Sequence, residues 1–323
     1  MPYISEDRFP KKPKLIFMGT PDFAVPSLKS LIDKKYEVVS VITQPDRPKG
    51  RGRKLTASPV KLTALEYGIE VLQPDNVSNE SFCSVIREKR ADLLIVVAFG
   101  QILRKNLLTA AGWGAINIHA SLLPKYRGAA PIQRAILNNE SVTGLTLMHL
   151  DEGLDSGPII FQKKLPVYRE ETAGQLHDRM ALVAGDFLIE SLDTMAGAQI
   201  STIPQDDSKA SYAAKINRAM ALVDWNMDAE SISALIRGLD PWPGAYTKLK
   251  RKELKLFSSS VLKEKDPCEK PGKVFSDDNG RFLVQTGKGV IEVREMQYAG
   301  KKRLTSRDFT RGLSLSEEIV LGT

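Results

Sequence analysis

Apolar positions along the first part of the 323-residue chain alternate between two patterns. Helical spacing is interrupted by short continuous apolar runs, of which residues 93–99 form the longest. Continuous runs of this kind are typical of strands that are buried on both faces of a parallel sheet. The alternation of such strands with helices predicts an α/β fold, namely a Rossmann-like doubly wound domain.

Individual elements follow from the same pattern and from local helix signals. Ser58 and Pro59 provide an N-cap and a first-turn proline, and Thr172 with Gln175 forms a capping box. The predicted strands cover residues 15–18, 38–43, 92–98, 115–118, 143–150 and 159–167, and the predicted helices include 58–68, 81–90 and a long one that ends at Gly197.

The pattern changes after Gly197. Residues 198–217 are mainly polar and contain Pro204, which favours a linker. Beyond a helix at 229–238, short alternating runs indicate the strands of a small β-barrel with an OB-like fold. The predicted domains are therefore 1–197, with 1–13 as an N-terminal extension, and 218–323, joined by a linker at 198–217.

Composition narrows the class of protein. Hydrophobic residues make up 42% and charged residues 26%, which excludes wholesale disorder, and the longest apolar run has seven residues where a membrane-spanning helix needs about 20. No apolar signal-peptide region follows the N-terminus, so we expect a cytoplasmic protein.

Cys83 and Cys268 are too far apart for a CxxC motif, and the three histidines are too scattered to predict a metal site. The net charge of +7 permits a polyanionic partner without requiring one.

The turn after the first strand, Gly19-Thr-Pro-Asp-Phe-Ala24, occupies the place of a dinucleotide-binding turn. It does not fit GxGxxG, because Pro21 and Phe23 stand in the wrong places, and the chain has no GxxxxGK[ST] sequence. Nicotinamide, flavin and P-loop chemistry are therefore not expected.

Asn117 and His119 alternate along a predicted strand, so their side chains point to the same face near its carboxyl end. Ligands of open α/β sheets bind at that end. An amide beside an imidazole can stabilise one developing oxyanion. For these two residues alone, a structural role remains the alternative: a core histidine whose ring nitrogens are hydrogen-bonded, and an asparagine in a turn.

A second stretch, Leu150-Asp-Glu-Gly153-Leu-Asp155-Ser-Gly157, is acidic and rich in glycine. It does not have the spacing of an EF-hand calcium loop, which places glycine sixth. A plain turn stays open for this loop by itself, but the two stretches together point to a site.

Asn117-x-His119-x-Ser-Leu-Leu-Pro124 followed by Gly153-Leu-Asp155-Ser-Gly157 resembles the active site of the folate-dependent formyltransferases, with the family's separation of 36 residues between His119 and Asp155. Over nearly the whole chain from Lys14 onward, the resemblance is to the branch that formylates methionine on initiator tRNA. It continues through residues 17–24, 43–52, 129–133, 240–246 and 308–312.

The resemblance implies a reaction and a catalytic trio. The formyl group of 10-formyltetrahydrofolate, the co-substrate, passes to the α-amino group of methionyl initiator tRNA by direct attack of the amine. Asn117 would hold the formyl oxygen, and His119 would stabilise the oxyanion or protonate the leaving nitrogen. Asp155 would orient the imidazole and accept the proton of the amine through water. No metal is implied.

The same resemblance implies the residues that bind folate. Ser121, Leu122, Leu123 and Pro124 correspond to the family's folate-binding segment, which we expect to offer free backbone groups to the pterin ring. Residues 98–103 match a second wall, with Gln101 and Ile102 as candidates. For the side chains of this second wall, an ordinary strand-to-helix turn remains open.

Basic residues provide candidate contacts to tRNA. Arg47, Arg51, Arg53 and Lys54 lie on a predicted flexible loop with two glycines, and Arg51 matches the functional arginine of the family's loop. Lys248 and Lys250 begin a second basic cluster. For both basic clusters, a solvated loop that binds no ligand remains the alternative.

Rival functions remain at this point. The nearest is formyl transfer to a small amine, such as an amino sugar or a glycinamide nucleotide, but those enzymes lack the arginine-glycine loop together with this second domain. A noncatalytic RNA-binding protein on the same scaffold predicts a damaged trio, whereas Asn117, His119 and Asp155 are intact. A folate hydrolase is excluded only weakly. We expect a monomer.

Overall fold

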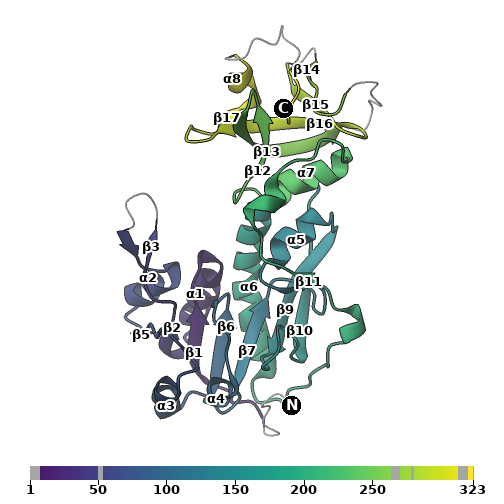
Figure 1. The fold of residues 1–323 in the computed structure, drawn as a ribbon. Coiled ribbons are helices and arrows are strands. Elements are labelled where there is room, and N and C mark those ends of the chain that lie inside the picture. Colours follow the sequence, from purple (N-terminus) through teal and green to yellow (C-terminus); the bar gives the residue numbers. More distant parts are fainter. Residues whose placement is uncertain (1–7, 50–53, 263–269, 278–279, 312–318, 323) are drawn as a thin grey trace. The chain divides into compact units, whose positions relative to one another are not determined.

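The computed structural model describes residues 8–49, 54–262, 270–277, 280–311 and 319–322, which form two compact units (Figure 1). Unit 1 consists of Met1–Gly128, Gly144–Leu165 and His177–Tyr212, and unit 2 of Ala129–Thr143, Pro166–Leu176 and Ala213–Thr323. Each unit is therefore assembled from three segments, whereas the predicted division at Gly197 is a single cut.

A seven-stranded sheet forms the centre of unit 1, in the order β10-β9-β7-β6-β1-β2-β5. Its strands pair in parallel from β5 to β7, and β9 joins β7 antiparallel. The alternation of strands and helices confirms the predicted α/β, Rossmann-like fold. The strands are β1 Lys14–Gly19, β2 Glu37–Ile42, β5 Val71–Leu72, β6 Leu93–Val97, β7 Ala115–His119, β9 Val142–His149 and β10 Ile159–Pro166.

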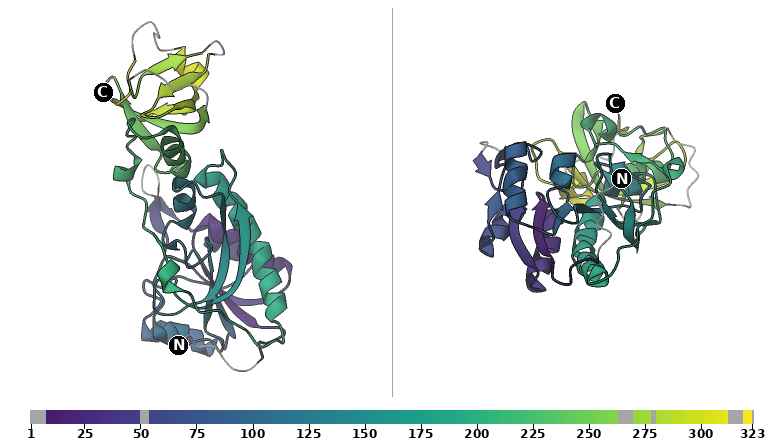
Figure 2. Two further views of the ribbon diagram at one scale, coloured as in Figure 1. Left: turned by 90° about the vertical axis from the view of Figure 1, so that its right-hand side faces the viewer. Right: turned by 90° about the horizontal axis from the view of Figure 1, so that it is seen from below.

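The helices begin where the sequence provides caps. Ser58 accepts a hydrogen bond from the backbone of Lys61 at the start of α2, and Asn79 caps α3 in the same way. Figure 2 shows the long helix α6 along the sheet of unit 1, and Lys163 on β10 donates to Glu190 on α6 at 2.8 Å. The helices are α1 Val25–Asp33, α2 Pro59–Glu66, α3 Glu80–Glu88, α4 Lys105–Leu108, α5 Pro131–Leu137 and α6 Ala173–Met195.

Several short strands were not expected from the sequence, and four of them form two pairs. β3 Arg47–Lys49 pairs with β4 Lys54–Thr56, so the basic segment predicted as a flexible loop begins and ends as a hairpin. β8 Arg127–Gly128 pairs with β11 Tyr212–Ala213, which lies in the segment predicted as a linker. Polar two- and three-residue strands have no apolar periodicity that could announce them.

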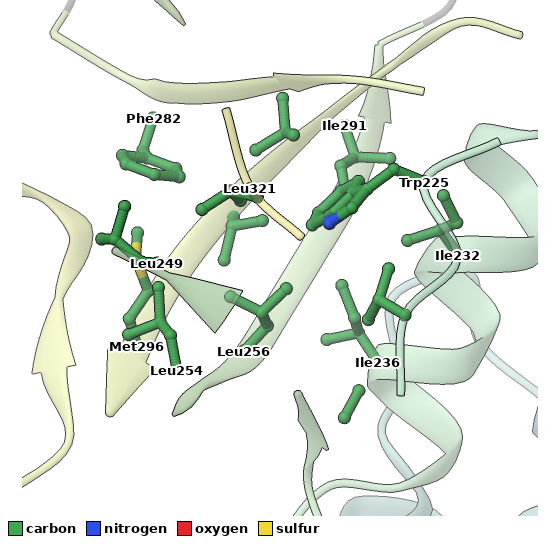
Figure 3. Packing of buried hydrophobic residues seen from close by; sticks show 14 of the residues in the cluster. Trp225, Ile232, Ile236, Leu249, Leu254, Leu256, Phe282, Ile291, Met296 and Leu321 are labelled. Atoms are coloured by element: carbon green, nitrogen blue, oxygen red, sulfur yellow. The ribbon is translucent and has the colours of Figure 1, made fainter. Parts of the chain in front are cut away.

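Unit 2 is built on an antiparallel sheet in the order β12-β13-β16-β15-β14, with β17 beside β16. The sheet is curled, and it confirms the expected OB-like architecture. In its core, Trp225 lies among Ile232, Leu256 and Ile291 (Figure 3), and the Trp225 indole donates to Thr247 Oγ1 at 2.9 Å. Besides α5, the elements of unit 2 are α7 Ala229–Gly238, β12 Ala245–Leu249, β13 Lys252–Leu262, β14 Val274–Ser276, β15 Phe282–Gln285, β16 Val290–Tyr298, β17 Leu304–Thr305 and α8 Ser306–Thr310.

None of the helices in the described ranges has the length and apolar character needed to cross a membrane.

Candidate active site

The candidate catalytic residues begin at the carboxyl edge of the parallel sheet of unit 1. Gly19, at the end of β1, is in register with Val97, at the end of β6, and Val96 is in register with Asn117 on β7. The segments that follow these strands therefore start at one edge, where ligands of open α/β sheets bind.

Asn117 lies on β7 with its side chain 9% exposed. Its amide makes no side-chain hydrogen bond to any residue that the structure describes. Amides that are largely buried normally have partners in the protein or in ordered water. The amide of Asn117 is therefore available to a bound carbonyl oxygen.

His119, two residues further along β7, is 6% exposed, and each of its ring nitrogens faces an oxygen. Its Nε2 lies 2.8 Å from the carbonyl oxygen of Tyr126, and because a carbonyl can only accept, Nε2 carries the hydrogen. Its Nδ1 lies 3.5 Å from Oδ2 of Asp155. In the imidazolium form both ring nitrogens would face an acceptor, which suits a group that stabilises negative charge.

Asp155 reaches His119 from a loop that starts far from it. β9 runs antiparallel to β7, and its last residue, His149, is opposite Ile116 near the amino end of β7. The chain then turns back, and Oδ2 of Asp155 accepts a hydrogen bond from the backbone nitrogen of Gly128 at 2.8 Å. Asp155 has φ = +50°, a left-handed conformation that costs free energy in a residue other than glycine.

Glycine is required where this loop ends. A Cβ at Gly157 would lie 1.8 Å from the carbonyl oxygen of His149. Any side chain there would push the loop away from β9. Gly157 thus permits the close approach from which Asp155 is presented.

His149 itself is buried, and its Nε2 has no hydrogen-bond partner among the residues that the structure describes. Burial lowers the pKa of His149 to about 4, so its imidazole is neutral at neutral pH. Its place inside the sheet agrees with a neutral core side chain.

The predicted folate-binding segment follows β7 directly. Ser121 and Leu123 are buried, whereas Leu122 and Pro124 are half-buried. Its backbone groups are less free than we expected: the carbonyl of Ser121 accepts from Thr146, and the nitrogen of Leu123 donates to the same hydroxyl. The carbonyls of Leu123 and Pro124 accept from Gln162 and from the backbone of Ser211. These bonds fix the shape of the segment, so its contacts with a ring would come mainly from its side chains.

The second predicted wall contains two different side chains. Gln101 turns toward residues 74–77, since its Oε1 accepts from the backbone nitrogen of Val77 at 3.1 Å. Ile102 is 80% exposed. The structure therefore leaves Ile102, rather than Gln101, as a side chain open to a ligand.

The predicted tRNA-binding residues are exposed where the structure describes them. Arg47 begins β3 and is paired with Thr56, Lys54 begins β4, and Arg47 donates weakly to Gln44 Oε1 at 3.4 Å. Arg51 and Arg53 lie outside the described residues. In unit 2, Lys248 is exposed on β12, and Lys250 occupies the two-residue turn between β12 and β13.

The two groups that contact His119 and Asp155 could not be predicted from the identities of the residues that carry them. The carbonyl of Tyr126 and the N–H of Gly128 hold His119 and Asp155, yet both are backbone groups. Within the described ranges, no three His, Cys, Asp or Glu side chains are grouped so as to bind a metal ion.

Known protein families match most of this chain. The family model "Formyl transferase" matches residues 13–192, and "Formyl transferase, C-terminal domain" matches residues 215–314. The methionyl-tRNA formyltransferase of Geobacter metallireducens is 45% identical over 95% of this chain and 98% of its own. The chain belongs to the methionyl-tRNA formyltransferases. A second member of this methionyl-tRNA formyltransferase family, from Clostridium novyi, is 46% identical over 95% of this chain and 99% of its own.

The methionyl-tRNA formyltransferase family assignment confirms the resemblance stated from the sequence. A solved structure with a similar fold is the N-formyltransferase from Helicobacter canadensis, in complex with folinic acid and dTDP-3-aminofucose. Its TM-score is 0.67, with 20% identity over 88% of this chain and 99% of that chain, which supports the shared fold.

Proposed function

We propose that this chain transfers the formyl group of 10-formyltetrahydrofolate to the α-amino group of methionyl initiator tRNA. The observation that carries the proposal is the arrangement on β7. The amide of Asn117 has no described partner, and His119 beside it is held between the Tyr126 carbonyl and Asp155. Relatives over 40% identical along nearly their full length are methionyl-tRNA formyltransferases.

The chemistry follows from this arrangement. The amine attacks the formyl carbon, the bond from that carbon to N10 breaks, and the amine loses one proton while N10 gains one. Asn117 donates a hydrogen bond to the formyl oxygen and then to the oxyanion, which is stabilised most when its donor is already in place. His119 supplies positive charge as an imidazolium, or the proton for N10 once one ring N–H turns from its present acceptor, and Asp155 takes the proton of the amine through water.

Folate would bind against residues 121–124 and Ile102. Leu122 and Pro124 are half-buried and Ile102 is exposed, so they can offer apolar surface to a flat ring. The hydrogen bonds of Ser121 and Leu123 hold that surface in one shape before folate arrives. Gln101 would support residues 74–77 and not contact the ring directly.

The tRNA would be held by exposed cations. Arg47, Lys54, Lys248 and Lys250 lie on hairpins, and Arg51 and Arg53 continue the first of these in sequence. Long cationic side chains suit phosphates, which need charge and reach but little shape. The protein would act as a monomer in the cytoplasm.

The test offers one donor to three acceptors. Purified protein is incubated with 10-formyltetrahydrofolate and methionine-charged initiator tRNA, methionine-charged elongator tRNA, or a nucleotide-linked amino sugar. We expect formyl transfer to the initiator. Transfer to the amino sugar alone, or release of formate with no acceptor used, would refute the proposal.

A further inference from the structure

Gln205 lies in the polar stretch that the sequence presents as a linker, yet its side-chain amide is fully occupied. Its Oε1 accepts from Nε and Nη2 of Arg127, at 3.0 and 2.8 Å. Its Nε2 donates to the carbonyl oxygens of Asp155 and Gly157, at 2.8 and 2.7 Å. A primary amide offers two lone pairs and two hydrogens, and all four are used here.

These bonds connect the two backbone segments that position His119 and Asp155. Asp155 and Gly157 belong to the loop that presents the carboxylate. Arg127 lies between Tyr126, whose carbonyl binds His119, and Gly128, whose nitrogen binds Asp155. Gln205 therefore joins the loop of the carboxylate to the segment that supplies its hydrogen-bond partner.

The backbone conformation of the loop that carries Asp155 explains why it needs this connection. Asp155 has φ = +50°, and a left-handed residue other than glycine persists only where its surroundings hold it. Gln205 binds the carbonyl of this same residue. The guanidinium on its other side is firmly placed, because Arg127 is 4% exposed and also pairs with Asp207 at 2.8 Å.

The segment that carries Gln205 is itself anchored to unit 1 at both ends. Ile203 exchanges two backbone hydrogen bonds of 2.8 Å with Ile159, at the start of β10. Ser211 accepts from the backbone nitrogens of Tyr126 and Arg127, through its hydroxyl and its carbonyl. Gln205 thus acts from a fixed backbone.

We propose that Gln205 is a positioning residue for formyl transfer, which holds Asp155 at His119 through the carbonyls of Asp155 and Gly157. The inference rests on the proposed function, because it assigns the effect of Gln205 to the same catalytic pair. It also assigns residues 203–211 to the active site.

The donor and acceptor groups of the Gln205 amide determine which substitutions test this proposal. Gln205→Glu keeps the size of the side chain and the acceptors for Arg127, but its second oxygen would face the carbonyls of Asp155 and Gly157 with no hydrogen to donate. Gln205→Ala removes both sets of bonds. Gln199→Glu, an exposed position in the same segment, is the matched control for added charge.

We expect both variants at Gln205 to lower kcat about 10- to 100-fold, within the range that positioning contributes, while KM for folate and for tRNA changes less than about twofold. The thermal midpoint should stay near that of the wild type in Gln205→Glu. Hydrogen exchange of the amides of residues 153–157 should become faster in both variants and remain unchanged in Gln199→Glu.

The outcomes separate the two proposals. If the wild type formylates tRNA and Gln205→Glu has wild-type kcat, or if KM rises while kcat is unchanged, the role of Gln205 is refuted and the proposed function stands. If the wild type transfers formyl to no acceptor, the proposed function fails. In that case, faster exchange at 153–157 would still show that Gln205 holds the loop, and unchanged exchange would refute that as well.

Discussion

The candidate catalytic site of unit 1 and the hairpin of unit 2 proposed to bind tRNA place their side chains in opposite ways. His119 is almost fully buried, and each of its ring nitrogens faces a specific oxygen. Lys248 and Lys250 are exposed on and after β12. The difference fits the two proposed tasks, because a developing oxyanion needs donors that are already aligned, whereas phosphates need cations that can move to meet them.

The hairpin nevertheless has a constraint of its own, in its backbone. Lys250 and Arg251 form a two-residue turn with φ values of +48° and +62°, where asparagine and glycine are the favoured residues. Such residues cost roughly 1–2 kcal/mol each relative to a relaxed conformation. The candidate site of unit 1 thus combines a left-handed residue, Asp155, with hydrogen bonds that hold its side chains, whereas the hairpin relies on a left-handed turn that presents two adjacent cations.

The largest effect is expected from removing the charge of Asp155. Asp155→Asn should lower kcat about 10²- to 10⁴-fold, because the imidazole of His119 loses its anionic partner and the amine loses its proton acceptor. Folate binding should survive, as measured by equilibrium titration. Glu152→Gln, exposed in the same loop, is the control and should retain wild-type turnover. Near-wild-type activity of Asp155→Asn would remove the carboxylate from the mechanism.

Asn117→Ala should lower kcat about 10²- to 10³-fold, the usual loss for one oxyanion donor. Its thermal midpoint should change little, because the amide has no described hydrogen-bond partner to lose. Single-turnover formylation and thermal unfolding together test this pair of expectations. A clear loss of stability with activity preserved would mean that Asn117 is a structural residue.

The buried sheet of unit 1 should also respond to pH, unlike the exposed hairpin. The pKa of His149 is about 4 in the folded protein and 6.5 without burial, so between these values the unfolded chain binds a proton that the folded chain excludes. Stability contributed by the neutral imidazole is complete above pH 6.5 and is lost as the pH falls toward 4, by about 3 kcal/mol. Hydrogen exchange of β7 and β9 amides, in urea at several pH values, measures this loss.

His149→Gln should flatten that dependence between pH 4 and 6.5. His177→Gln is the control, since the His177 side chain is 30% exposed and lies beside Asp178. An unchanged pH dependence in His149→Gln would show that other groups are responsible.

The smallest effect is expected at the hairpin. Replacing both Lys248 and Lys250 by alanine should raise KM for tRNA several-fold at low salt and leave kcat unchanged. The slope of log kcat/KM against log salt should become shallower by about 1 to 2, since each phosphate contact contributes nearly one. Lys12→Ala with Lys34→Ala provides a control of equal charge. Equal salt slopes in the two double variants would exclude this hairpin from tRNA binding.

The sequence predicts best what depends on apolar burial and on local spacing. The strand 93–97 is apolar and buried throughout, and the alternation of Asn117 and His119 placed both on one face of β7. The curled sheet of unit 2 was likewise expected from short alternating runs. In each of these cases the physical cause repeats along the chain, so it can be read without the fold.

What the sequence did not provide are contacts between polar groups far apart in the chain. Gln205 and Arg127 are separated by 78 residues, and Gln205 and Asp155 by 50. Residues 198–217 have the composition of a linker, but hydrogen bonds attach residues 203–211 to unit 1. The partners of His119 and Asp155 at Tyr126 and Gly128 are backbone groups, which every residue has.

The distance in sequence between β7 and Gln205 has a consequence for how the enzyme is made. A ribosome synthesises the chain from its N-terminus, so Asn117 and His119 leave the exit tunnel well before Gln205 and Ser211. On the proposed role of Gln205, a nascent chain can complete its parallel sheet and still lack the clamp on Asp155. Full catalytic competence would then appear late in translation, when residues 203–211 emerge and dock.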